Sequence, residues 1–306
     1  MKLRLSLVAL GVVAVAAGVW LWPQPRASER PRLPGRIYGW SYTSLRPRRI
    51  RPHSPFLYLG DQGLIVPASG PSAGTIRWVA ASPDGRSLMA TQQSAFVIVW
   101  SLDRTGYHTL TLPGADPANL SWAGNDRVVH WDPRTEEVRG WRLEEGGLVE
   151  LPARELPGWW RGIGAPDGTR PVRRALSPDL RRAIVVTQAA VWLITGTVSE
   201  LAPRRLALPP CLTAEWLSPE RWWCLQRDRG IVTLLDRDGH PVRSTDLRGS
   251  IPTVTVSPDG EYAAFHPGMR WTLRGWRPVP LQVARLSDGK RWELGFDALT
   301  PVVWLP

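Results

Sequence analysis

Two segments of the chain gather tryptophan and arginine, residue types that suit binding better than bond-breaking chemistry. They are Glu155–Gly164 and Pro267–Arg277. An indole ring offers a large apolar face and one N–H donor, and a guanidinium offers a planar fork that matches carboxylate or phosphate. Both side chains are enriched where binding energy concentrates in protein interfaces. The candidate binding residues are Trp159, Trp160, Arg161, Arg270, Trp271, Arg274, Trp276 and Arg277.

Residues that would indicate catalysis or a metal centre do not form a pattern. The chain contains no Gly-x-Ser-x-Gly elbow, no His-Glu-x-x-His and no P-loop, and its five histidines are scattered. Cys211 and Cys224 lack the close spacing of a metal site. We expect two small buried thiols, with a disulfide between Cys211 and Cys224 as the alternative. We therefore assign no catalytic residue, no metal and no cofactor.

A short turn phrase, Ser-Pro followed by an acidic residue, recurs between apolar runs. Proline presets the backbone for the first turn position, and Asp and Gly tolerate the reversal that follows. The copies recur at a period of roughly 40 residues, which is typical of β-propeller blades. Four full copies stand at Ser82–Gly85, Ser177–Asp179, Ser218–Glu220 and Ser257–Gly260, and a weaker one at Trp122–Asp126.

A second hairpin signal keeps the same register as the first. It is a run of strand-forming residues that ends in an Asp, Thr or Gly turn. The Ser-Pro turn is predicted to join strands a and b of each blade, and this second turn to join strands c and d. The copies are Val99–Gly106, Gly140–Gly147, Val191–Gly196, Val232–Gly239 and Val283–Gly289.

The segment Leu102–Thr111, preceded by the Ser-Pro-Asp-Gly turn, resembles the WD-like repeat of TolB-type β-propellers. The resemblance covers residues 74 to 295 and is weaker where Ser-Pro is missing, near Trp122. It implies the fold, and it favours an extracytoplasmic protein, since TolB-type propellers are commonly found there. A repeat type carries no particular activity.

The repeats predict an all-β protein, a six-bladed β-propeller of four-stranded antiparallel blades. Five blades fall at 74–114, 117–155, 170–208, 211–248 and 251–295. We expect the two ends of the chain to build the sixth blade together, with Thr300–Pro306 as strand a, Ile37–Tyr42 as strand b, and Phe56–Val66 as strands c and d. Such closure removes exposed sheet edges. Five or seven blades are the alternatives.

Tryptophans recur at equivalent points of these repeats and are predicted to pack between adjacent blades. They are Trp78, Trp122, Trp216 and Trp304 before the a–b turn, and Trp100, Trp141 and Trp192 on strand c. The two segments rich in tryptophan and arginine lie in a blade-to-blade connection and a b–c loop, which leave a blade on the same face. We expect both to decorate that face with exposed tryptophans; the alternative is that they fold back and pack over blade edges.

The chain is basic, with a net charge of +11, and lysine occurs only at Lys2 and Lys290. Net positive charge suits nucleic acid, anionic lipid or an acidic polymer. No nucleic-acid-binding motif accompanies the arginines, so we expect no nucleic acid as partner.

The N-terminus carries a basic start and then Leu5–Trp22, an uncharged run that predicts a transmembrane or signal-anchor helix over residues 1–22. Cleavage and secretion are the alternative. Residues 23–36 are predicted as a linker rich in proline and arginine, and 37–306 as the propeller. The linker arginines favour a cytoplasmic propeller by the positive-inside rule. The order of basic start, apolar run and folded domain favours the extracytoplasmic side, which we expect.

These features together predict a membrane-tethered, extracytoplasmic propeller that acts as a non-catalytic binding or scaffolding module. Its expected partner is a protein, or an anionic polymer or peptide of the cell envelope. The alternative is a propeller enzyme or ligand sensor with a site in the central tunnel, of a hydrolase, lactonase or quinoprotein type.

Overall fold

The computed structural model describes residues 31–41, 50–73, 76–92, 96–103, 106–112, 116, 118–132, 135, 137–196, 201–248, 251, 253–272, 275–296 and 298–306. At 269–272, 275–278, 299 and 300 it describes the backbone alone. The chain divides into two units, Met1–Arg32 and Leu33–Pro306, and the strands of the described residues all fall in the second. The predicted helix at 1–22 lies outside the described residues. No helix within the described ranges is long and apolar enough to cross a membrane.

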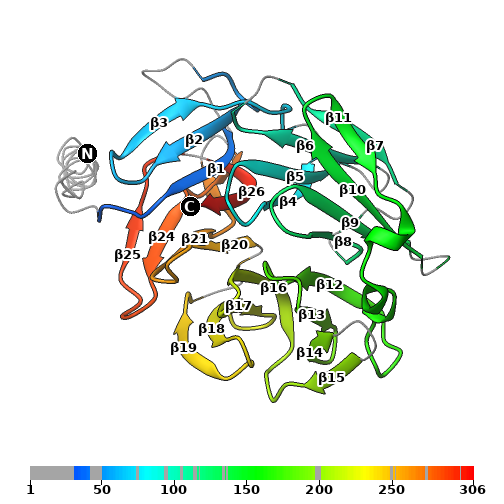
Figure 1. The fold of residues 1–306 in the computed structure, drawn as a ribbon. Helices are drawn as coiled ribbons and strands as arrows, with labels where there is room; N and C mark the ends of the chain where they lie inside the picture. The colour runs from blue at the N-terminus through cyan, green and yellow to red at the C-terminus, as the bar shows by residue number, and fades with distance from the viewer. Residues whose placement is uncertain are drawn as a thin grey trace, which may run out of the picture. The chain divides into compact units, whose positions relative to one another are not determined.

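Residues Leu33–Pro306 form six four-stranded antiparallel sheets arranged around a ring (Figure 1), which confirms the predicted all-β propeller. Blade 1 contains β4 (Ile76–Ala81), β5 (Ser87–Gln92), β6 (Phe96–Ser101) and β7 (His108–Thr111). Blade 2 contains β8 (Leu120–Trp122), β9 (Arg127–Trp131), β10 (Val138–Glu144) and β11 (Gly147–Glu150). Blade 3 contains β12 (Pro171–Leu176), β13 (Arg182–Thr187), β14 (Val191–Gly196) and β15 (Leu201–Arg205).

The second half of the ring follows the same order, with one addition. Blade 4 contains β16 (Cys211–Ser218), β17 (Arg221–Gln226), β18 (Ile231–Asp236) and β19 (Pro241–Asp246). Blade 5 contains β20 (Thr253–Val256), β21 (Tyr262–His266), β24 (Gln282–Arg285) and β25 (Arg291–Glu293). Blade 6 contains β26 (Ala298–Leu305), β1 (Arg36–Ser41), β2 (Pro55–Leu59) and β3 (Leu64–Pro67). The addition is a separate hairpin between β21 and β24, formed by β22 (Met269–Thr272) and β23 (Gly275–Pro278).

The Ser-Pro-Asp turn works through a buried hydroxyl that fastens strand a to strand b. In the last copy, Ser257 Oγ donates to the Asp259 carboxylate at 2.6 Å and accepts the backbone N–H of Tyr262 at 2.9 Å. Ser82 and Ser177 make the same pair of bonds. The blade 4 copy departs from this pattern: Ser218 is half-buried and accepts the N–H of Glu220 at 3.2 Å.

We expect Ser257→Ala to cost about 1–3 kcal/mol of unfolding free energy, because it removes a buried hydroxyl and leaves the half-buried Tyr262 N–H without its acceptor. Ser218→Ala is the matched control, since its hydroxyl is partly solvated and bonds only within the turn. Urea unfolding of both variants measures the difference. Equal losses at the two positions would show that the hydroxyl network does not fasten the strands.

The ring closes by pairing the last strand of the chain with the first. β26 is the innermost strand of blade 6 and pairs with β1, with Val303 opposite Tyr38 and Trp304 opposite Ile37. This confirms that both ends of the chain build one blade. The Trp304 indole N–H also donates to the Pro34 carbonyl at 2.6 Å, and its backbone N–H donates to Thr255 Oγ1 in blade 5 at 2.9 Å.

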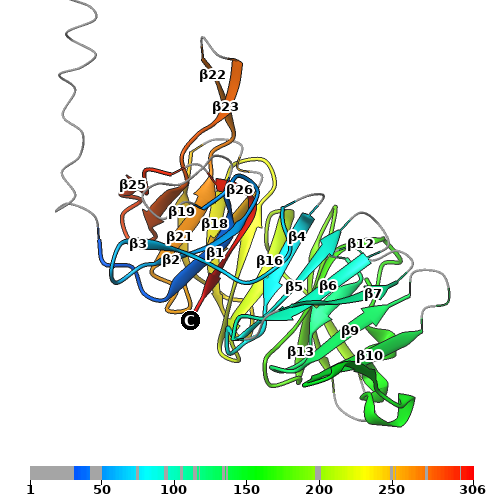
Figure 2. The ribbon, with the colours of Figure 1, turned by 90° about the horizontal axis from the view of Figure 1, so that it is seen from above.

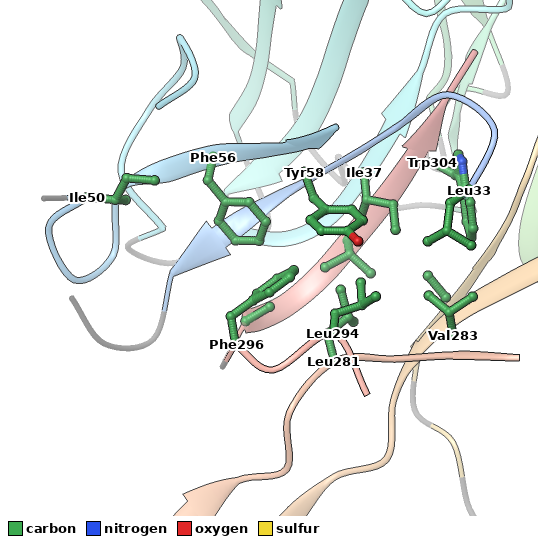
Figure 3. Close-up of a cluster of buried hydrophobic side chains, with 13 residues drawn as sticks. Leu33, Ile37, Ile50, Phe56, Tyr58, Leu281, Val283, Leu294, Phe296 and Trp304 are labelled. Carbon is green, nitrogen blue, oxygen red and sulfur yellow. The ribbon is translucent and has the colours of Figure 1, made fainter. Parts of the chain in front are cut away.

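Blade 6 packs on blade 5 through a cluster of buried apolar side chains (Figure 3). Phe56 and Phe296 meet edge to face, with ring centroids 5.2 Å apart. Trp304 belongs to this cluster, and Tyr262 of blade 5 stacks against it with centroids 6.5 Å apart. The closing strand is therefore held by backbone pairing and by apolar packing at once.

Gly35 lies where the two ends of the chain come closest. Its backbone is left-handed, with φ of +69°, and a Cβ there would lie 2.1 Å from the Leu305 carbonyl oxygen. Only glycine permits this approach. Gly124, in the a–b turn of blade 2, has a similar φ of +77° but open space around it.

We expect Gly35→Ala to destabilise the protein by clearly more than Gly124→Ala. The control variant pays only the left-handed strain of about 1–2 kcal/mol, whereas the Gly35 variant must also displace the closing strand. Thermal unfolding compares the two. A loss at Gly35 no larger than that at Gly124 would mean that the ends are not locked at this point.

Tryptophans join adjacent blades, as predicted from the repeats. The Trp122 indole N–H donates to the Ala80 carbonyl of blade 1, and the Trp216 indole N–H donates to the Ala175 carbonyl of blade 3, both at 3.1 Å. Each bond therefore ties strand a of one blade to strand a of the blade before it. Trp100, Trp141 and Trp304 are buried in clusters that combine residues of two blades.

Candidate functional site

The order of strands gives the ring two chemically different faces. The a–b and c–d turns emerge on one face, here called the turn face. The b–c loops and the blade-to-blade segments emerge on the other, here called the connection face. Any surface built by insertions into b–c loops belongs to the connection face.

The turn face is acidic because its turns are built with carboxylates. Asp84, Asp179 and Asp259 each accept a backbone N–H within their own turn. The Arg285 guanidinium and the Lys290 N–H hold the pKa of Asp288 at about 2, so that carboxylate is ionised at neutral pH. The described acidic residues between strands here are Asp61, Asp84, Asp103, Asp126, Glu145, Asp179, Glu220, Asp238, Asp259, Glu261 and Asp288, against Arg86, Arg181, Arg237 and Lys290.

The connection face lacks this acidic excess. Outside the 151–170 segment, the described charged residues of its loops are Arg51, Arg227, Arg229 and Arg248, against Asp116, Asp132, Glu137 and Asp228, and the hairpin β22–β23 adds Arg270 and Arg277. The two faces of the ring therefore differ in charge: the turn face carries an excess of described acidic residues, and the connection face does not.

The first segment rich in tryptophan does not form a surface. It folds into two short 3₁₀ helices, η2 (Ala153–Glu155) and η3 (Gly158–Gly162), which lie between blades 2 and 3 (Figure 1). Trp159 is 7% exposed and Trp160 is 1% exposed. The expectation that these two tryptophans are in solvent is wrong, and the packing alternative holds. Arg161 of the predicted set is exposed.

The burial of this segment has a clear physical cause. Trp159 and Trp160 pack with apolar residues of blades 2 and 3, and the Trp131 indole N–H donates to the Trp160 carbonyl at 2.8 Å. A Cβ on Gly196 of blade 3 would fall 2.1 Å from the Trp159 ring. The segment is a wedge between two blades, so its tryptophans are part of the buried packing of the fold.

The second segment forms the hairpin β22–β23, which stands away from the ring (Figure 2). Within the described residues its two strands pair only with each other. The register sets Trp271 opposite Trp276 and Arg270 opposite Arg277. Arg274, also predicted for the site, lies outside the described residues. The hairpin is a b–c insertion of blade 5 and so belongs to the connection face. Both segments leave the blades on the connection face, as predicted, but only the second stands away from the ring.

The centre of the ring contains a buried arginine that sequence reasoning missed. Arg173, on the innermost strand of blade 3, is 2% exposed. Its guanidinium bonds both Glu215 carboxylate oxygens in blade 4, at 2.7 and 2.9 Å, and the Leu120 carbonyl in blade 2, at 2.6 Å. It also lies 4.6 Å from the centre of the Trp78 ring in blade 1. One side chain thus joins four blades. The Arg173–Arg174 doublet in an otherwise apolar strand was its only signal in the sequence.

We expect Arg173→Met to destabilise the ring by about 3–5 kcal/mol, since it leaves the Glu215 carboxylate without its partner. The double variant Arg173→Met/Glu215→Leu should recover a large part of this loss, because no charge is then left unpaired. Chemical denaturation of the single and double variants gives both values. A double variant no more stable than the single one would contradict a pairing role for Glu215.

The two cysteines lie on neighbouring strands but do not face each other. Cys211 is opposite Gln226, and Cys224 is opposite Ala214. Both cysteines are buried and unbonded in the structure, as in the expectation of two buried thiols. Contact with the Cys224 thiol and burial raise the pKa of Cys211, which keeps it protonated.

Chemistry-bearing groups are otherwise dispersed across the described part of the chain. No three His, Cys, Asp or Glu side chains there lie close enough together to hold a metal ion. A cavity of about 450 Å³ opens beside the b–c loop of blade 6. Its lining is mostly proline, glycine, serine and alanine, with Arg51 as the charged residue. This lining provides no group placed for acid–base or nucleophilic work.

Comparisons with known proteins show what fold the chain has, but they do not show a function. The structure of TolB from Acinetobacter baumannii is similar over 90% of this chain and 68% of its own, with a TM-score of 0.60 at 11% sequence identity. Weaker similarities include Kuenenia stuttgartiensis hydrazine synthase (73% of this chain, 68% of that one, TM-score 0.45, 15% identity). They also include the β-propeller domain of Myceliophteria thermophila Cps50 (79% and 90%, TM-score 0.45, 12% identity). No protein-family model and no curated protein matches the sequence. The chain is a six-bladed β-propeller with structural similarity to TolB.

Proposed function

We propose that this protein is a membrane-tethered, extracytoplasmic binding or scaffolding module whose contact element is the hairpin β22–β23. The partner is an anionic protein, peptide or polymer of the cell envelope. The binding residues are those of the predicted set that fall on this hairpin, namely Arg270, Trp271, Trp276 and Arg277.

The observation that carries this proposal is that the hairpin lies outside the six-sheet ring. Four strands complete blade 5 without it, and β22 and β23 contribute to no blade. A two-stranded ribbon alone is only marginally stable in water. Its register also sets Arg270 directly opposite Arg277, a like-charge pair that weakens a hairpin by itself. An anionic partner removes that penalty, which supports a role in binding over a role in stability.

The polar groups at the centre of the ring favour binding over catalysis. The Arg173 guanidinium is already bonded to Glu215 and to Leu120, so these groups are used in joining blades. The predicted alternative, chemistry in the central tunnel, gains no support from this arrangement.

Capture of cross-linked partners from membranes tests the proposal. The full chain should retain a specific partner, and a variant with Met269–Pro278 replaced by a short Gly-Ser turn should lose it. Val279 N–H already donates to the Gly268 carbonyl at 2.9 Å, so the replacement closes without moving blade 5. Its melting temperature should therefore stay close to that of the parent.

The matched control changes the linker arginines Arg26, Arg30 and Arg32 to glutamine and keeps the hairpin. This variant should still capture the partner. Capture that survives hairpin replacement, or that disappears with the linker arginines alone, would contradict the assignment of the hairpin as the contact element.

A further inference from the structure

We infer that the outer edge of β22 binds an extended polypeptide by strand addition, and that the segment it selects alternates acidic and apolar residues. This inference rests on the proposed function and specifies the partner of the same hairpin. It is carried by the backbone pairing of β22 and β23 and by the residue types that the register sets together.

The pairing shows which backbone groups are open. Val279 N–H donates to the Gly268 carbonyl, and hydrogen-bonded pairs alternate with non-bonded pairs along an antiparallel ribbon. Arg270 and Arg277 are therefore a bonded pair, whereas Met269–Pro278 and Trp271–Trp276 are non-bonded pairs. The backbone groups of the non-bonded pairs are directed toward the two outer edges of the hairpin.

The two edges differ in what they offer. On β23 one of the outward positions is Pro278, which has no N–H to donate. On β22 the outward positions are Met269 and Trp271, and both can donate and accept. Proline is a common device for blocking a sheet edge against added strands. The hairpin thus has one blocked edge and one open edge, and the open edge is the template for a third strand.

The register also defines the chemistry of that third strand. Positions directly opposite share a face of the ribbon, so Arg270 and Arg277 fall on one face and Trp271 and Trp276 on the other. An added strand alternates between the same two faces. Acidic residues at every second position would place carboxylates beside the arginine pair, and the intervening apolar residues would lie beside the tryptophan pair. Opposite charges and aromatic–aliphatic contacts both favour such cross-strand neighbours.

Fluorescence anisotropy with the full chain in detergent micelles and a labelled peptide that alternates Glu and Val tests the inference. The Glu–Val peptide should bind at least about tenfold more tightly than a peptide of the same composition with its Glu and Val in two blocks. A Lys–Val peptide should not bind. In the variant Arg270→Glu/Arg277→Glu the preference should reverse toward Lys–Val, which a general loss of folding cannot produce.

Edge blocking provides the second arm. Met269→Pro removes an outward N–H from β22 and leaves the bonds between β22 and β23 in place, so peptide binding should fall by at least about tenfold. Met269→Val is the matched control and should bind as the parent does. Equal binding to Met269→Pro and Met269→Val would overturn strand addition.

The remaining outcomes separate this inference from the proposed function. Capture of a membrane partner that needs the hairpin, with no preference for the alternating peptide, would overturn the strand-addition inference and leave the binding module intact. A second outcome concerns lipid. The 33–306 ring, which contains all six blade sheets, could adsorb to phosphatidylglycerol vesicles while it fails to bind the peptide. Adsorption that Met269→Pro leaves unchanged would overturn strand addition in favour of lipid headgroups. If neither peptide, vesicle nor membrane partner needs the hairpin, both proposals fail.

Discussion

The antiparallel pairing of β26 with β1 is the interaction on which the rest of the structure depends. Each blade covers its neighbour with apolar side chains, and an open row of blades would expose such a surface and a sheet edge at each end. Joining residues from the two ends of the chain in one sheet removes both. Gly35 permits the backbone contact, and Trp304 bonds to Pro34 on one side and Thr255 on the other. Closure therefore fixes the position of blades 5 and 6, and with them the base of the hairpin.

The architecture could be predicted because its signals are local and repeated. The Ser-Pro-Asp turn is specified within five residues by one hydroxyl and one carboxylate, and its recurrence sets the blade boundaries. The closing strand could be predicted because its sequence matches the innermost strand of other blades. Trp122 and Trp216 occupy the same position in their repeats and make the same bond to the preceding blade. The turn motifs and the period at which they recur indicate the same blade boundaries, and this agreement makes the fold predictable from the sequence.

The site was harder to predict because its signals are compositional. The wedge at Glu155–Gly164 and the hairpin are both rich in tryptophan, arginine and glycine. Which of the two is buried depends on the blades that surround it, and composition does not encode that. Trp159 and Trp160 are covered because two diverging blades leave an apolar gap that their rings fill. Arg173 was missed for a related reason. Its partners Trp78, Leu120 and Glu215 come from three other blades, at separations that no local pattern encodes.

The Arg173 contacts also divide the ring into two mechanically different sectors. Blades 1 to 4 are cross-linked at the hub by one guanidinium, whereas blades 5 and 6 take no part in that junction. Those two blades are held by sheet pairing, by apolar contact and by separate hydrogen bonds, such as those from Trp304 N–H to Thr255 Oγ1 and from Thr245 Oγ1 to the Leu286 carbonyl. On heating, blades 5 and 6 should therefore unfold locally before blades 1 to 4. Their amide hydrogens should exchange with solvent sooner than those around Arg173. The hairpin proposed as the contact element therefore stands in the sector that the Arg173 junction does not reach.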